Sequence, residues 1–351
     1  MDYSKLGIYL DWNSSGLLHP SVFEVMRSCW QLYTNPDSKH FIGQQSKSYL
    51  KKLENKLLDK LGAGIIKASP CSSCEVNGYR VIFTSGASEA NISLLKSYDS
   101  IIVSDVDHPS VRDCPSATVI PVNENGMINL DLLKQKLEIA KSKTLVSAIL
   151  ANHETGVIND IRQVSDLVHS YGGHVHTDAV QAFGRIDIDL QKLDVDYMTI
   201  SALKCGGPAG VGALIHREYL PPFAWGNKAR LGTIPIPLVA GLVEALEVQR
   251  SSNQYLENLL PNELIVGNSL NRLANTTCIL CPNKTEVMMA LDLAGICVSS
   301  GAACTSGTAD KAHSAIAMGI NEDTIRISSG WYNKNDDFDK CYQILKLLLN
   351  L

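Results

Sequence analysis

Short apolar runs and amphipathic segments alternate along the middle of the chain. Between about residues 80 and 217, seven runs have the length and apolar content of buried strands. Helical periodicity separates several of them, most clearly over 129–142 and 161–172. This alternation predicts an α/β fold with a mostly parallel sheet covered by helices. The seven runs are YRVIF, SIIVS, ATVIPV, TLVSAILA, HVHTDA, DYMTIS and GVGALIHR.

The pattern changes after residue 235. A long apolar helix is predicted around residues 238–252. A short strand, a helix over 284–295, a loop of small residues and a terminal helix over 339–349 follow. This arrangement predicts a smaller α+β domain. We expect residues 15–235 to form the large domain, and residues 1–14 with 236–351 to form the small one.

Composition narrows the possible partners. The 351 residues carry a formal net charge of -5, and no Lys/Arg cluster interrupts the pattern. Nucleic acid is therefore not an expected partner. The N-terminus lacks the apolar core of a secretory signal, and no run is long enough to span a membrane. We expect a cytoplasmic protein without a membrane partner.

The ten cysteines do not predict disulfides, because a large chain without a secretory signal is expected in a reducing compartment. Cys278 and Cys281 lie in a strand-like segment, where residues three apart point to opposite faces. They are therefore not expected to share a metal ion. Cys71 and Cys74 lie in a polar loop, where either a metal or redox pair or two surface thiols is possible. No metal site is predicted.

Polar residues at strand ends are the candidates for chemistry, because ligands of open parallel sheets bind beyond the carboxyl ends of strands. Asp178 closes one apolar strand, Gln181 follows three residues later, and Lys204 comes 26 residues after Asp178. A buried ammonium or carboxylate is costly unless it has a partner. Residues 85–88 are a turn of small residues before a helix, which suits a phosphate or is simply a helix start capped by Ser88. Together these groups match the needs of pyridoxal phosphate: an amine, a carboxylate for the ring nitrogen and a phosphate anchor.

Three further residues each have two possible roles. His108 follows a strand and is either a hydrogen-bonded structural residue or a side chain lying over a flat ring. Cys304 lies in a loop of small residues, where a thiol can be exposed and reactive, in contrast to Cys297 in the preceding strand-like segment. Arg326 stands alone in an apolar strand, suited to gripping a substrate carboxylate or to an ion pair.

With these residues the sequence resembles the cysteine desulfurases, pyridoxal-phosphate enzymes of the class V aminotransferase group with fold type I. The resemblance implies conversion of L-cysteine to L-alanine, with transfer of sulfur to an enzyme persulfide for delivery to an acceptor protein. It runs through nearly the whole chain. The motifs that carry it are YLDWNSSG, NPDSKH, FTSGASEAN, DVDHPSV, NHETGVIND, HTDAVQAFG, SALKCGGPAGVGAL, RLGT, VSSGAACTSG and TIRISSG.

The resemblance also implies residue roles. Lys204 would form the Schiff base, Cys304 the persulfide, and His108 would stack on the cofactor ring. Arg326 and Asn35 would bind the substrate. Thr233 would reach into the partner subunit's site, which implies a homodimer. The implied cofactor contacts are Ala87, Ser88, His108, His153, Asp178, Gln181, Ser201, Lys204 and Thr233.

The chain departs from the family pattern at several places. Leu203 stands where the family usually has histidine, and His153 replaces the second asparagine of an Asn-Asn-Glu motif. The glycine-rich run before Arg-x-Gly-Thr is replaced by AWGNKARLGT. The chain ends soon after its last predicted helix, so a docking tail used by some members is not expected. The acceptor, an iron-sulfur scaffold or a tRNA-thiolation protein among others, stays open.

Alternative functions remain at this point. A selenocysteine lyase or a class V aminotransferase would share the fold and the cofactor, but neither would require Cys304. A catalytically weak scaffolding homologue is the alternative outside enzymes, and Leu203 and His153 are the residues that suggest it.

Overall fold

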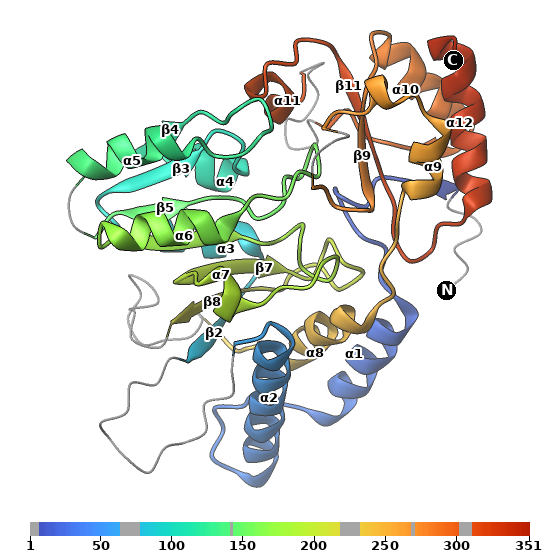
Figure 1. Cartoon of the computed structure of the whole chain (residues 1–351). Helices are drawn as coiled ribbons and strands as arrows, with labels where there is room; N and C mark the ends of the chain where they lie inside the picture. Colours follow the sequence, from blue (N-terminus) through green and yellow to red (C-terminus); the bar gives the residue numbers. More distant parts are fainter. Residues whose placement is uncertain (1–6, 64–77, 141–142, 218–231, 268–270, 302–310) are drawn as a thin grey trace.

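The computed structural model describes residues 7–63, 78–140, 143–217, 232–267, 271–301 and 311–351. A seven-stranded sheet is the centre of the larger region (Figure 1). Its order is β2-β8-β7-β6-β5-β3-β4, and only β8 runs antiparallel to its neighbours. All seven predicted runs are strands of this sheet, and the predicted fold class is confirmed. The strands are β2 (Tyr79–Thr84), β3 (Ile101–Ser104), β4 (Ala117–Ile120), β5 (Leu145–Ser147), β6 (His174–Asp178), β7 (Tyr197–Ser201) and β8 (Gly212–Arg217).

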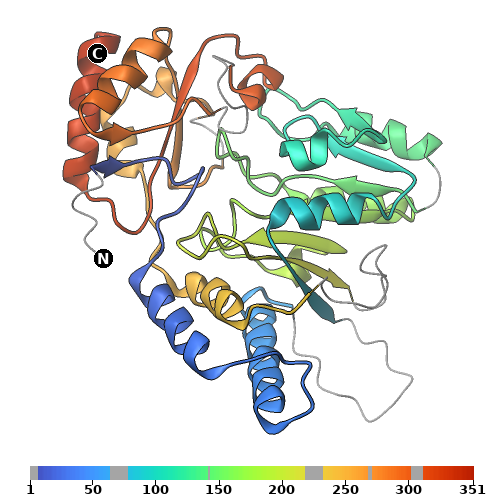
Figure 2. The same ribbon diagram turned by 180° about the vertical axis from the view of Figure 1, so that it is seen from behind.

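Helices cover both faces of this sheet. On one face α5 (Leu130–Ile139), α6 (Ile161–Ser170) and α7 (Leu190–Leu193) pack on residues such as Ile102 and Val175. On the other, α3 (Ala87–Leu95) and α4 (Pro109–Arg112) pack on Ile101 and Val103. Figure 2 shows α3 as the cyan helix in front of the sheet. Successive side chains of β3 point to opposite faces of the sheet and therefore pack in both of these cores. Strands of parallel sheets are usually buried on both faces in this way.

Three helices form a group below the sheet in Figure 1: α1 (Pro20–Leu32), α2 (Phe41–Lys60) and α8 (Ile236–Glu244). The predicted helix over 238–252 is wrong in its length. Helix α8 ends at Glu244, a 3₁₀ turn covers Ala245–Glu247, and Val248 has extended backbone angles. The β-branched Val248 and the serines after it favour this end over another helical turn.

The smaller region contains two short sheets and the C-terminal helices. Strand β1 (Ile8–Tyr9) pairs in parallel with β10 (Ile296–Cys297), and β9 (Thr276–Leu280) pairs antiparallel with β11 (Thr324–Ser328). These sheets share an apolar core with three of the helices given next, which are α9, α10 and α12. The helical elements are α9 (Gln254–Leu259), the 3₁₀ turn Asn262–Leu264, α10 (Lys284–Leu293), α11 (His313–Ala317) and α12 (Asn335–Leu349).

Side-chain packing bears on the predicted domain division. Helix α8 belongs to the core of the larger region, whereas Leu10 and Leu256 belong to that of the smaller one. The boundary near residue 235, as a limit between folding units, stays a prediction. Cys278 and Cys281 lie in different apolar clusters, as expected for opposite faces of one strand. Among the described residues no helix has the length and apolar character needed to cross a bilayer.

Candidate active site

A cavity of about 430 Å³ lies at the carboxyl ends of the sheet strands. Its size is that of a pocket for a small organic ligand. Most of its wall comes from segments that directly follow β2, β3, β5, β6 and β7, which is where ligands of parallel sheets bind. The lining residues of the predicted site are Ala87, Ser88, His108, His153, Asp178, Gln181, Ser201, Lys204 and Arg326, with Leu203 beside them.

Lys204 lies in the turn that follows β7, and its side chain lines this cavity. Its Nζ donates a hydrogen bond to the backbone oxygen of Ser14. Its own carbonyl accepts a hydrogen bond of 2.8 Å from Arg185. The N-terminal segment therefore holds the Lys204 amine at the cavity wall. This wall is at the edge of the sheet where β6 also ends.

Asp178 ends β6 and is buried. Its Oδ2 accepts a hydrogen bond of 2.8 Å from Asn91 of α3, and its Oδ1 accepts one of 3.0 Å from the Val180 amide. Among the described residues no cation forms an ion pair with it. A buried carboxylate of this kind can still accept a bond from a protonated nitrogen in the cavity. Asn91, which orients it, belongs to a motif whose asparagine received no role from the sequence.

The start of α3 forms another part of the wall. Gly86 is the N-cap residue and makes no side-chain cap bond, so the alternative of Ser88 as the cap is wrong. The amides of the first turn therefore face the cavity without a capping side chain, a suitable arrangement for a phosphate. Gly212 of β8 approaches closely: a Cβ there would lie 2.8 Å from Gly86 C and 3.0 Å from Ala87 N. Only glycine allows this approach.

Two histidines meet in the cavity, with ring centroids 5.6 Å apart. His108 caps α4, and its Nδ1 accepts a bond of 3.1 Å from the Ser110 amide, which leaves Nε2 to carry the proton of the neutral ring. His153 is held neutral: burial first, and then His108, Arg326 and Lys204, lower its pKa well below the ordinary value. Its buried Nδ1 has no hydrogen-bond partner in the described structure. An imidazole nitrogen is thus available where the family pattern has an amide.

Arg326 on β11 forms the ion pair that was one of its two possible roles, and its grip on a substrate carboxylate stays a prediction. The side chain is 1% exposed and lines the cavity, but its Nη2 also pairs with Asp11 Oδ1 at 2.8 Å. Nη1 donates to the His153 carbonyl at 2.8 Å, whereas the buried Nε has no partner in the described structure. The ion pair holds the guanidinium at the cavity wall, and a substrate carboxylate would have to share it with Asp11.

Comparison with known proteins identifies the family. The class-V aminotransferase family matches residues 8–233. The chain is 30% identical over 379 aligned residues to a cysteine desulfurase of Cereibacter sphaeroides, covering 96% of this chain and 94% of that protein. The chain belongs to the cysteine desulfurase family.

Other members of the family agree with this result. Cysteine desulfurase IscS of Ehrlichia chaffeensis is 29% identical, over 95% of this chain and 88% of that protein. Among solved structures, a NifS-like protein from Rickettsia africae matches with a TM-score of 0.83 at 29% identity, covering 98% of this chain and 100% of that one. The similarity therefore extends over both regions of the fold.

The sequence gave the N-terminal segment 11–14 no role beyond its place in the motif YLDWNSSG, although it connects much of this cysteine desulfurase site. Asn13 Nδ2 donates to the His153 carbonyl (3.2 Å) and to Thr276 Oγ1 (3.0 Å), and its carbonyl accepts from Gln181 Nε2 (3.0 Å). Ser14 Oγ accepts from Arg326 Nη2 at 2.9 Å. The polar run after an apolar strand is a signal that could have indicated this role.

Some predicted site residues are not brought to this cavity. Asn35 lies in the exposed connection between α1 and α2, where its Oδ1 accepts a bond of 3.0 Å from Asp37, and it does not line the cavity. Thr233 is exposed and does not line it either, so its contact with a partner's site stays a prediction. Cys304 lies outside the described residues, as do Cys71 and Cys74.

Most of the described cysteines are poor candidates for the reactive thiol. Burial raises the pKa of Cys205, Cys278 and Cys341 to about 12 and that of Cys281 to about 11. The pKa of Cys297 is raised as well, mainly by burial and then by Asp292. Thiols with such pKa values remain protonated and unreactive at neutral pH.

Proposed function

We propose that this chain is a pyridoxal-phosphate-dependent cysteine desulfurase, which converts L-cysteine to L-alanine and takes the sulfur onto Cys304 as a persulfide. The observation that carries the proposal is the convergence of Lys204, Asp178, Gln181, His108 and the start of α3 on one cavity. Membership of the family supports the same activity. A selenocysteine lyase and a class V aminotransferase would share this fold, but no observation on the described residues specifically favours either of them.

The residues present fit the cofactor. Lys204 supplies an amine, and buried Asp178 has no ion-pair partner among the described residues, so a protonated ring nitrogen would provide one. The uncapped first turn of α3, with Ala87 and Ser88, would hold the phosphate together with Ser201. When bound, pyridoxal phosphate supplies an electron sink for the bonds at the substrate Cα.

The chain's own residues supply the rest of the chemistry. Lys204, once its amine is free, is the base for the proton on the substrate Cα. Arg326 would orient the substrate carboxylate at the cavity wall, and His108, which lines the same cavity, would lie against the cofactor ring. Leu203 contributes an apolar surface to the wall where the family usually has histidine.

The sulfur step requires a thiolate near this cavity. The Cys304 thiolate attacks the substrate sulfur, the carbon–sulfur bond breaks and its electron pair stays with carbon, which takes a proton to give alanine. The new sulfur–sulfur bond is the persulfide. Gly301, the last described residue before 302–310, lies next to the neighbour of His153 in the chain: a Cβ on Gly301 would lie 3.9 Å from Glu154 Cβ.

Incubation of the purified protein with pyridoxal phosphate and L-cysteine tests the proposal. We expect alanine to be released and the peptide containing Cys304 to gain the mass of one sulfur atom. Cys304→Ala should bind the cofactor normally and lose alanine production, whereas Cys114→Ala should keep it. Full alanine production by Cys304→Ala would contradict the proposed persulfide step.

The homodimer is part of the same proposal. Helices α1 and α2 both expose large apolar side chains, which are Trp30 and Leu32 at the end of α1 and Phe41 and Ile42 at the start of α2. A second copy of the chain would cover this group, which is unusual on a monomer surface. The exposed position of Thr233 supports contact with a partner subunit. A protein acceptor for the persulfide sulfur and a cytoplasmic location complete the proposal.

A further inference from the structure

A second cation lies beside Lys204, and neither the family resemblance nor the proposed function assigns it a role. Arg185 follows Gln181 by four residues in a segment with helical-type turns, closed by bonds from Phe183 N to Ala179 O (2.8 Å) and from Ile186 N to Ala182 O (3.1 Å). Residues four apart in such turns share one face. Arg185 and Gln181 therefore point together toward the N-terminal segment.

The Arg185 guanidinium bonds only to neutral oxygen atoms among the described residues. Its Nη1 donates to Asn13 Oδ1 at 2.6 Å and to Gln181 Oε1. Its Nη2 donates to the carbonyls of Lys204 (2.8 Å) and Trp12 (3.3 Å). Burial lowers the pKa of Arg185 to about 10, so the group is still charged at neutral pH. Arg185 is half-buried, and a cation in such surroundings is usually paired with a carboxylate.

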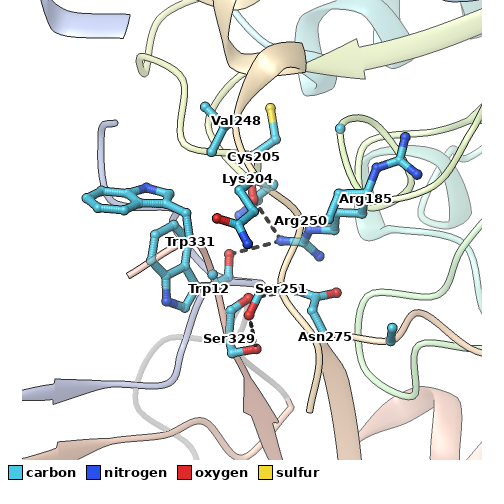
Figure 3. Close-up of a pocket in the computed structure, with 14 residues that line it drawn as sticks. Trp12, Arg185, Lys204, Cys205, Val248, Arg250, Ser251, Asn275, Ser329 and Trp331 are labelled. Carbon is cyan, nitrogen blue, oxygen red and sulfur yellow. Dashed lines mark hydrogen bonds between the residues drawn. The ribbon is translucent and has the colours of Figure 1, made fainter. Parts of the chain in front are cut away.

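The other side of Arg185 offers no carboxylate either. A small cavity of about 40 Å³ lies there, and Figure 3 shows Arg185, Lys204 and Arg250 among its lining residues. None of the residues that line it is Asp or Glu. Arg250 has its own partner, because its Nη2 pairs with Asp187 at 2.6 Å. The charge of Arg185 is therefore not neutralised from this side.

We propose that Arg185 is a positioning residue for Lys204 and Gln181, and that its charge makes the linkage between Lys204 and an aldehyde cofactor lose its proton more easily. The bonds to the Lys204 carbonyl and to Gln181 Oε1 fix the lysine backbone and the orientation of the amide. Gln181 Nε2 is thereby the donor, bonded to the Asn13 carbonyl. A nearby like charge disfavours a protonated linkage. This inference rests on the proposed function.

Other groups also act on the linkage, and all of them remain when only Arg185 is changed. Cys205, adjacent to Lys204, is neutral because burial raises its pKa to about 12. The charged or titratable groups that line the larger cavity are Glu89, His108, His153, Asp178 and Arg326, and Asp11 pairs with Arg326.

The test compares Arg185→Met, which removes the charge, with Arg185→Lys, which keeps it. Each protein is loaded with pyridoxal phosphate, and the visible absorbance of the bound cofactor is titrated with pH. We expect the midpoint to rise by about one pH unit in Arg185→Met, because a neighbouring like charge shifts a pKa by that order. Arg185→Lys should titrate within a few tenths of a unit of the parent. Both variants should bind the cofactor more weakly, because lysine cannot make all four bonds.

Arg250→Met is the matched control, because Arg250 lines the same small cavity but is already paired with Asp187. It should titrate like the parent protein. An unchanged midpoint in Arg185→Met would overturn the inference about charge, and unchanged cofactor affinity in both Arg185 variants would overturn the positioning role. If the parent protein itself binds no cofactor, the proposed function fails instead. Melting of each apoprotein establishes folding, and Arg185→Gln takes the place of Arg185→Met if the latter does not fold.

Discussion

Individual buried side chains set how this protein responds to acid. His176 on β6 lies between Ser147 Oγ (2.8 Å) and Thr199 Oγ1 (3.0 Å), inside the sheet. Burial lowers its pKa to about 4. The unfolded chain therefore binds a proton at His176 near pH 6.5, whereas the folded chain does not until about pH 4. Its contribution to stability is fully present above pH 6.5 and is lost as the pH falls toward 4.

We predict that His176→Gln makes stability less sensitive to acid. Between pH 7 and 4.5 the parent should lose about 2 kcal/mol more free energy of unfolding than the variant, from the difference between the two pKa values. Urea unfolding of the apoprotein at both pH values measures this. His169 is a control of opposite sign, because its hydrogen bond to Asp196 raises its pKa and acid strengthens that bond. His169→Gln should lose more stability than the parent on acidification, and an identical acid response in His176→Gln would contradict the prediction.

At the scale of elements, the close contact between β8 and the start of α3 determines the shape of the expected phosphate site. Gly212 pairs with Thr84 on β2 and with Ser201 on β7, so its backbone is fixed on both sides. A Cβ at this position would lie 2.8 Å from Ile200 O and 2.8 Å from Gly86 C. Because both neighbours are backbone atoms, the start of α3 would have to move.

We predict that Gly212→Ala destabilises the protein by about 1–3 kcal/mol, the usual cost of overpacking, and weakens cofactor binding more than tenfold. Gly86→Ala is the matched comparison for folding, because Gly86 has an extended backbone and a Cβ there would meet no atom within 4 Å. Its free energy of unfolding should stay within about 0.5 kcal/mol of the parent. Chemical unfolding and titration with pyridoxal phosphate measure the two effects. If Gly212→Ala and Gly86→Ala were equally stable, the contact between β8 and the start of α3 would not exclude a side chain at residue 212.

Predicted and observed structure can be compared most directly for whole strands and helices. The strands could be predicted because most of them are short apolar runs, and the ends of the runs marked the edge of the sheet where Asp178 and Ser201 lie. Once this edge was located, the residues at the strand ends that line the cavity could be predicted as well. The end of α8 could not be predicted, because the apolar pattern continues past Glu244 although the helix does not.

Contacts between distant parts of the chain explain what the sequence missed. Asp11 meets Arg326, 315 residues away, and Asn13 meets Thr276, 263 residues away. No periodicity connects such positions, so the choice between an ion pair and a substrate grip for Arg326 stayed open. Arg185 was missed for the same reason, because its partners come from three separate turns of the fold.

For the whole molecule, the N-terminal segment joins the two regions at the cavity. Helices α1 and α2, which carry the exposed apolar side chains, lie below the sheet in Figure 1. Trp30 is 59% exposed and Phe41 is 75% exposed. The stacked rings of Tyr33 and Tyr49, with centroids 4.3 Å apart, hold the segment that connects the two helices. The apolar group is therefore presented on an ordered surface, which suits association with a second copy better than a loose segment would.

We predict that Trp30→Glu combined with Phe41→Glu converts the proposed dimer to a monomer, because each charge would be buried unpaired at a two-fold interface. Sedimentation velocity at micromolar concentration measures the change, and the dissociation constant should rise by at least about 100-fold. Leu293→Glu is the control: this residue is 86% exposed on α10 of the smaller region, so it should leave the dimer intact. A dimer that survives the double substitution but dissociates in Leu293→Glu would place the interface on the smaller region. In that case, Thr233 would have to reach the partner subunit's site across a surface other than the one formed by α1 and α2.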